Sequence, residues 1–171
     1  MSNHKYDGDG KLVTVGLSGT YNTSRPKFLG AGGGLMLSTV KDCWRFTQMI
    51  LNGGEFEGKR YLEASTVEMI HTNVLESDVR LRLYRRDING LGFGLGYAIV
   101  QDPAAAKTSQ GPQSYFWGGP YGTWFWIDPI NNMIVIGFIN NINGASSAGA
   151  PLVRELSAQL VYRTMNESSR N

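Results

Sequence analysis

The sequence predicts an α+β fold in which a C-terminal helix packs on an antiparallel sheet. Three observations support this class: helical periodicity within residues 38–73, alternation and turn signals over residues 92–140, and a final helical pattern over residues 151–166. Helices therefore come first, a consecutive set of strands follows, and one helix ends the chain. This segregation is typical of α+β proteins, whereas α/β proteins alternate helices and strands.

The first helix is expected between two clear end signals. Residues 1–37 are polar and glycine-rich, so we expect loop or extended chain there. Ser38 and Thr39 can cap the helix that follows, because short hydroxyl side chains accept the free N–H groups of the first turn. Asn52-Gly53-Gly54 ends it, since glycine adopts the left-handed conformation common after helices. The apolar residues between recur at helical spacing: Val40, Cys43, Phe46, Met49 and Ile50.

A second, shorter helix is expected to reach about Asn73. Ser65 and Glu68 have the spacing of a capping box, in which each side chain satisfies a free backbone donor of the other's turn. Residues 74–91 are charged and irregular, and we expect no regular element in them.

The pattern changes to strands at Gly92. Bulky residues from Phe93 to Ile99 alternate with glycine and small residues, which predicts one strand with a nearly bare face. After a loop, further strands are expected at residues 114–119, 121–128 and 133–139, with a turn at Asp128-Pro129. Pro151 then begins the last helix, whose apolar stripe is formed by Leu152, Leu156 and Leu160.

Composition excludes several classes of protein. The chain has 171 residues, is 42% hydrophobic and 18% charged, and carries a net charge of +2. A disordered chain would have fewer apolar residues and more net charge. The 22 glycines follow no collagen period, and no apolar run is long enough to span a membrane.

Cofactor and nucleic-acid sites are not expected. The glycine runs miss the offsets of a dinucleotide loop, and His4, His71 and Cys43 are not at metal-ligand spacing. One cysteine cannot form an internal disulfide, and the first ten residues carry no secretory signal, which leaves the compartment open. The basic residues Arg80, Arg82, Arg85 and Arg86 fit a solvated loop or strand edge better than a nucleic-acid module.

Two stretches are candidates for chemistry. Ser38 and Lys41 match the Ser-x-x-Lys pattern of a serine nucleophile beside a lysine. We favour plain helix capping for Ser38, because the chain contains no Tyr-x-Asn to complete such a site. In the aromatic stretch 115–126, Gly118 and Gly119 permit either close approach of a ligand or a corner in the sheet.

Five motifs in order resemble the serine β-lactamase family, and most of all its class C-like esterases and D-alanyl-D-alanine carboxypeptidase relatives. The resemblance covers about residues 28–140. It rests on residues 32–39 (GGGLMLST), 46–54 (FTQMILNGG), 91–96 (LGFGLG), 117–123 (WGGPYGT) and 126–129 (WIDP). It implies a single partial domain over residues 1–171, which lacks the N-terminal strands and the nucleophile region of the family's fold.

The resemblance also implies site residues. Family members carry Ser-x-x-Lys, then Tyr-x-Asn, then a Lys/His/Trp-x-Gly strand, and Trp117-Gly118-Gly119 matches only the third. Trp117, Gly118, Gly119, Pro120 and Tyr121 would then line the substrate pocket. The family's second oxyanion donor is the backbone N–H after this motif, where Pro120 has none.

The expected function is therefore the C-terminal part of a serine β-lactamase-like hydrolase acting on β-lactam, ester or D-Ala peptide acyl groups. It would be inactive alone, and its exposed sheet edge would pair with a second copy or a separate N-terminal half. The alternative is a non-catalytic interaction domain that binds a partner through that edge. A third possibility is an autonomous esterase that uses Ser38.

Overall fold

A five-stranded antiparallel sheet forms the centre of the molecule, in the order β11-β10-β9-β8-β7. The structure is a computed structural model, and it describes residues 3–15, 38–83, 86–119, 122–141 and 153–168. The sheet strands are β7 (Leu91–Phe93), β8 (Ala98–Val100), β9 (Tyr115–Gly118), β10 (Trp124–Asp128) and β11 (Met133–Gly137). The helices are α1 (Val40–Leu51), α2 (Ala64–Ile70), α3 (Pro103–Ala106) and α4 (Val153–Ser168).

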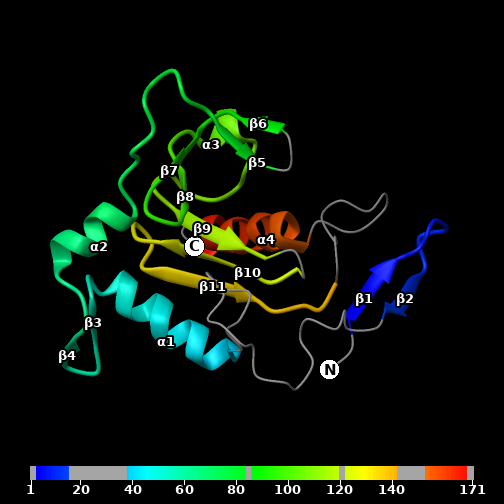
Figure 1. The fold of residues 1–171 in the computed structure, drawn as a ribbon, viewed down its shortest axis with the longest axis horizontal. Coiled ribbons are helices and arrows are strands. Elements are labelled where there is room, and N and C mark those ends of the chain that lie inside the picture. Colours follow the sequence, from blue (N-terminus) through cyan, green and yellow to red (C-terminus); the bar gives the residue numbers. More distant parts are fainter. Residues whose placement is uncertain (1–2, 16–37, 84–85, 120–121, 142–152, 169–171) are drawn as a thin grey trace, which may run out of the picture.

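Different helices cover the two faces of this sheet (Figure 1). On one face, Ile50 of α1 packs with Ile127 and other residues of the strands. On the opposite face, Ala158 of α4 packs with Trp126. Trp126 and Ile127 belong to different cores because successive side chains of a strand point to opposite faces. The α+β class, with a C-terminal helix on an antiparallel sheet, is thus confirmed.

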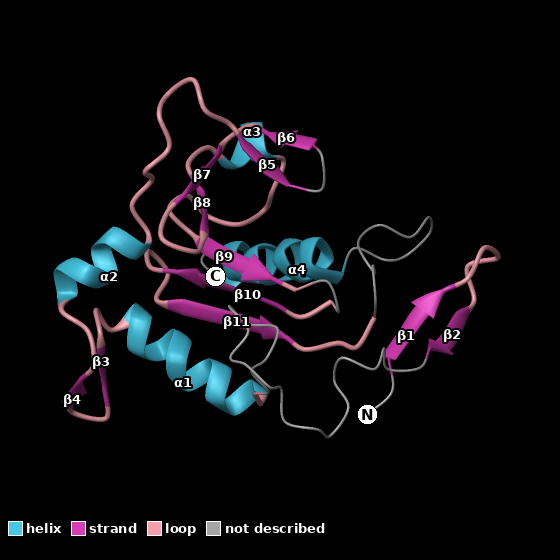
Figure 2. Ribbon diagram, viewed as in Figure 1, coloured by secondary structure: helices cyan, strands magenta, loops and turns pink. Residues whose placement is uncertain are grey.

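Among the described residues, three two-stranded hairpins lie outside the main sheet (Figure 2). They are β1 (Asn3–Tyr6) with β2 (Leu12–Val15), β3 (Glu55–Phe56) with β4 (Lys59–Arg60), and β5 (Leu81–Leu83) with β6 (Arg86–Ile88). The first lies where we expected loop or extended chain. The third lies within residues 74–91, so the expectation of no regular element there is wrong. In its turn, Asp7 Oδ1 accepts the N–H groups of Asp9 and Lys11 at 3.1 and 2.9 Å. His4 donates its N–H to the carbonyl of Asn140, just beyond β11.

The single strand predicted from Phe93 to Ile99 is wrong. The segment is a hairpin in which Phe93 is opposite Ala98, and the N–H of Gly94 donates to the carbonyl of Tyr97. Gly96 has a φ of +97°, which places it in the turn and not on a bare strand face. Bulky and small residues keep alternating through this tight turn. Their period-two spacing therefore cannot distinguish one continuous strand from a hairpin of two.

The predicted ends of α1 are confirmed, but the predicted cap of α2 is wrong. α1 begins after Thr39, whose Oγ1 accepts the N–H of Asp42, and ends at Asn52 as expected. The capping box at Ser65 is wrong: α2 begins at Ala64, with Glu63 in the cap position and no side-chain cap bond. Ser65 therefore lies inside the first turn.

The leucine stripe predicted for the last helix does not face the sheet. Leu156 and Leu160 are 48% and 65% exposed, whereas Ala158 is 2% exposed against the sheet. The large rings of Trp124 and Trp126 already fill this face, so the helix contacts it through a small residue. Leu152 lies outside the described residues.

Candidate active site

The glycines of the third motif end β9 and begin a tight turn into β10. The N–H of Gly119 donates to the carbonyl of Thr123 at 2.8 Å, and the N–H of Gly122 donates to the carbonyl of Gly119 at 3.1 Å. A Cβ at Gly118 would lie 2.9 Å from the Thr123 carbonyl oxygen, and one at Gly119 would lie 2.9 Å from Thr123 Oγ1. Gly118 therefore needs glycine because the Thr123 carbonyl lies across the turn, whereas a Cβ at Gly119 would require the Thr123 hydroxyl to move.

The other edge of β9 is open beside this turn. β8 pairs with β9 at Tyr115 and Phe116, and no described strand pairs with that edge at Gly118. The N–H of Gly119 points to β10, and the backbone groups of successive residues point to alternate edges. The N–H and carbonyl of Gly118 consequently point to the open edge. Pro120 and Tyr121, the two other predicted lining residues, lie outside the described residues.

Trp117 stands next to this open edge, and the residue is 36% exposed. The ring of Phe93, from β7, meets it in a T-shaped contact with centroids 5.4 Å apart and planes at 72°. Such aromatic pairs contribute about 0.5–1.5 kcal/mol beyond the area they bury. The exposed indole is thus held by a second ring from a neighbouring part of the sheet.

Asn73, after α2, fixes the backbone of β7. Its Oδ1 accepts the N–H of Phe93 at 2.9 Å and that of Leu75 at 3.2 Å. The carbonyl of Phe93 accepts the N–H of Val74 at 2.9 Å. The glycines beside Phe93 permit this approach, because a Cβ at Gly92 would lie 2.5 Å from Asn73 Oδ1. The segment after α2 therefore satisfies both backbone groups of Phe93.

Ser38 and Lys41 lie elsewhere, at the start of α1. Both are exposed, and Ser38 Oγ donates to the Thr39 carbonyl at 3.3 Å. Thr39 is the capping residue, and its hydroxyl also donates to Asp42 Oδ2 at 2.8 Å. Within the described residues, the structure gives this segment a helix-capping role and brings it no partner from the third motif.

The tyrosines with shifted pKa values are not activated as bases. Burial, with a smaller contribution from Cys43, raises the pKa of Tyr97 to about 12. Burial also raises the pKa of Tyr115 above its ordinary value. Both hydroxyls therefore stay protonated at neutral pH, whereas a general base works best with a pKa near the operating pH.

A buried carboxylate joins three segments at the far end of β10. Asp128 is fully buried, and its Oδ1 accepts the N–H groups of Ile130 and Asn131, both at 3.0 Å. Its Oδ2 accepts a bond from the Asn131 amide at 2.7 Å and another from the Tyr162 hydroxyl of α4. Burial, followed by this bond to Asp128, raises the pKa of Tyr162, which keeps the hydroxyl a donor.

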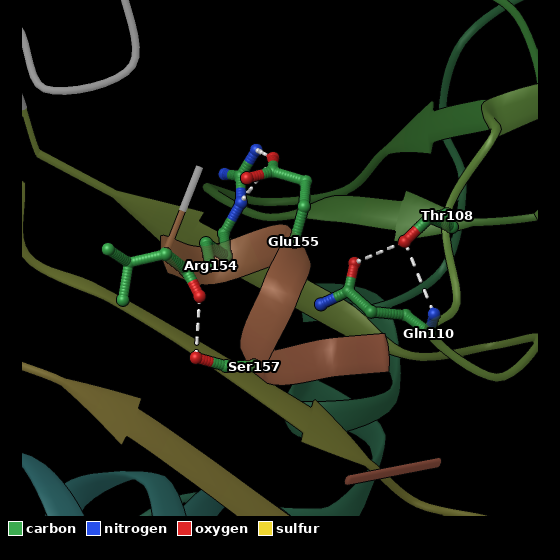
Figure 3. Close-up of polar contacts among 6 residues, drawn as sticks. Thr108, Gln110, Arg154, Glu155 and Ser157 are labelled. Carbon is green, nitrogen blue, oxygen red and sulfur yellow. Dashed lines mark hydrogen bonds and ion pairs between the residues drawn. The ribbon is translucent and has the colours of Figure 1, made fainter. Parts of the chain in front are cut away.

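Further polar contacts surround the start of α4 (Figure 3). Thr108 Oγ1 donates to Gln110 Oε1 at 3.4 Å, and Arg154 contacts Glu155 at 2.8 Å. The guanidinium of Arg154 also lies 5.2 Å from the centre of the Phe116 ring. Of these contacts, the one between Arg154 and Phe116 joins the helix to the sheet, on the face opposite Ile127.

No metal centre or membrane span emerges from the described ranges. They contain no group of three or more His, Cys, Asp or Glu residues that could hold a metal ion. None of their helices is long and apolar enough to cross a bilayer.

A family model described as beta-lactamase matches residues 2–159. The chain belongs to the beta-lactamase family. Protein Rv1367c of Mycobacterium tuberculosis strain H37Rv is 33% identical over 140 residues, which cover 79% of this chain and 35% of that protein. The protein MT1414 of strain CDC 1551 has the same identity and coverage.

One solved structure, EstCE1, supports the fold. EstCE1, "a hydrolase with promiscuous acyltransferase activity", superposes with a TM-score of 0.61 at 20% identity, covering 88% of this chain and 41% of that one. A penicillin-binding protein homologue from Caulobacter crescentus has a TM-score of 0.43 at 16% identity, with 57% and 25% covered. The chain spans roughly a third of the length of its curated relatives, Rv1367c and MT1414.

Sequence reasoning did not find three residues that shape this region. Phe93 and Thr123 lie within quoted motifs and Asn73 lies outside them, but none was expected at the site, because each acts through a contact made only in the folded chain. The close pairs of glycines were the available signal, because Gly92, Gly118 and Gly119 lie where another part of the chain approaches the backbone.

Proposed function

We propose that this chain is the C-terminal part of a serine β-lactamase-like hydrolase that acts on small acyl substrates and needs the upstream part of the fold for activity. The open edge of β9 at Gly118, beside the exposed indole of Trp117, carries the proposal. This geometry supports a role for Trp117 and Gly118 of the third motif in lining a substrate pocket. The family match and the partial coverage of the relatives support it.

The chemistry of the proposal is acyl transfer. A serine from the upstream part would attack the acyl carbonyl, and backbone N–H groups would stabilise the oxyanion. The chain would supply the pocket wall formed by Trp117, Gly118 and Gly119, with Pro120 and Tyr121 beside it. EstCE1 is a hydrolase with acyltransferase activity, and we extend hydrolysis of an ester or β-lactam to this chain as a proposal.

A chimera tests this function. The upstream part of a family member that carries Ser-x-x-Lys and Tyr-x-Asn is fused ahead of residue 1, and hydrolysis of p-nitrophenyl acetate and nitrocefin is measured. We expect turnover that is absent from the chain alone and is lost when the upstream serine is changed to alanine. Activity of the chain alone that disappears in Ser38→Ala would instead support an autonomous esterase. No turnover in a folded chimera would overturn the proposal.

The outer edge of β11 supports a second candidate function, that of an interaction domain. No described strand pairs with this edge, and its residues from Met133 to Ile136 are all apolar. Natural edge strands are usually protected by charges, proline or bulges, so an apolar edge favours pairing with another strand. We propose that the edge pairs with a second copy or with the upstream half of the fold.

Sedimentation distinguishes these partners. The chain alone is expected to form dimers or larger species with rising concentration, while the chimera sediments as a monomer because upstream strands occupy the edge. A monodisperse monomer of the chain alone at all concentrations would contradict pairing. Dimers that persist in the chimera would assign the edge to self-association.

A further inference from the structure

Two exposed tryptophans in this chain are each supported by a phenylalanine, but only one lies at the candidate active site. Trp117 meets Phe93 with centroids 5.4 Å apart, and Trp44 meets Phe56 with centroids 5.8 Å apart and planes at 83°. Trp117 and Trp44 are 36% and 42% exposed as whole residues. The pairs are therefore alike in geometry and exposure, and they differ in what surrounds them.

The Phe93–Trp117 pair is part of a fixed surface. Asn73 Oδ1 holds the N–H of Phe93, and Val74 donates its N–H to the Phe93 carbonyl. Both strands that carry the rings belong to the main sheet. Two exposed apolar residues lie beside Phe93. Val74 is joined to it by this hydrogen bond, and Leu95 is two residues further along the chain. The surroundings of the pair are thus apolar and held by backbone hydrogen bonds.

The pair is also continuous with the open backbone edge. Trp117 immediately precedes Gly118, whose N–H and carbonyl point to the unpaired edge of β9. A ligand whose carbonyl group lies along that edge would place its neighbouring substituent against the indole. An exposed indole face offers dispersion and quadrupole contacts that suit a flat apolar group.

We propose that Phe93 and Trp117 form a subsite for an aryl substituent on the acyl side of the substrate, with Phe93 as the positioning residue for Trp117. This subsite rests on the proposed hydrolase function, because its ligand is the substrate of that hydrolase. Binding of an aryl ester to the chain tests the subsite alone. Its failure is therefore distinguishable from a failure of turnover in the chimera.

Nuclear magnetic resonance of the indole N–H groups tests the subsite directly. The ¹⁵N-labelled chain is titrated with ethyl phenylacetate and, separately, with ethyl acetate, and the Trp117 signal is assigned from Trp117→Phe. We expect the phenyl ester to shift the Trp117 signal to saturation and ethyl acetate to leave it in place. Phe93→Leu is expected to raise the Kd by about three- to tenfold, the contribution of one aromatic contact. Phe93→Tyr retains the ring and should bind within about twofold of the wild type.

The second tryptophan provides the matched control. Phe56→Leu removes the ring beside Trp44 and is expected to leave the Kd unchanged, with the Trp44 signal unmoved by the ester. If Phe93→Leu does not fold, Trp117→Leu replaces it, and loss of saturation transfer to the ester protons supports the subsite. Equal shifts of Trp44 and Trp117, or no shift of Trp117, would overturn the proposal. An unchanged Kd in folded Phe93→Leu would show that Phe93 is not part of the subsite.

Discussion

Replacing Pro120 with alanine is expected to raise the kcat/KM of the chimera for p-nitrophenyl acetate by about 10²–10³-fold. In the family, the backbone N–H at this position stabilises the oxyanion of the tetrahedral intermediate, and proline has no N–H in any conformation. One oxyanion donor is worth roughly 2.7–4 kcal/mol of transition-state stabilisation. The neighbouring N–H of Gly119 does not replace it, since it already donates to the carbonyl of Thr123.

The control for this prediction is Pro112→Ala. Pro112 lies in the exposed loop before β9, so its replacement removes a proline without adding a donor beside the third motif. The two variants are compared at equal folded fraction, as judged by their thermal unfolding midpoints. A gain confined to Pro120→Ala supports a missing oxyanion donor. Equal gains in both variants, or no gain in either, would show that Pro120 does not limit catalysis.

The order of elements could be predicted because it depends on local patterns. A window of a few residues is enough to show each of three features. They are the apolar positions Met49 and Ile50 of α1, the turn at Asp128 and the apolar run of β11. The hairpin between β7 and β8 could not be separated from a single strand, because its turn contains glycine and bulky residues in the same alternation. Only the φ of Gly96 and the pairing of Phe93 with Ala98 reveal the reversal.

The face of α4 that meets the sheet depends on a partner distant in sequence. Leu156 and Leu160 form the stronger local stripe, yet Ala158 and Tyr162 make the contacts with the sheet. The rings of Trp124 and Trp126 fill that face, and they are stacked with centroids 5.4 Å apart. A small residue is needed where the helix crosses them, and periodicity within the helix cannot show this.

The candidate site could be located from its motif but not built from it. Trp117-Gly118-Gly119 identifies the strand, whereas the support for Trp117 comes from Phe93, whose backbone is held by Asn73. These two residues are 20 positions apart in the sequence, and no fixed spacing links them. Gly92 leaves room for the Asn73 side chain to reach Phe93. The sequence alone does not show which side chain approaches this glycine.

Asp128→Ala is expected to lower the free energy of unfolding by about 3 kcal/mol, because buried donors lose their acceptor. Its carboxylate accepts four hydrogen bonds, from the N–H groups of Ile130 and Asn131, the Asn131 amide and the Tyr162 hydroxyl. Removing it leaves the Tyr162 hydroxyl without this acceptor under α4. The loss therefore weakens the turn between β10 and β11 and the docking of the C-terminal helix together.

Asp102→Ala is the matched control for this buried carboxylate, since Asp102 also accepts two backbone N–H groups, at 2.9 and 3.1 Å, but at the exposed start of α3. Loss of such a cap costs about 1 kcal/mol. Urea unfolding followed by circular dichroism measures both variants, and Tyr162→Phe in each background isolates the bond to the helix. If the bond matters, Tyr162→Phe destabilises the wild type and the Asp102→Ala variant alike and adds little to Asp128→Ala. Equal losses from the two aspartate variants, or full additivity with Tyr162→Phe, would show that Asp128 acts only as a turn residue.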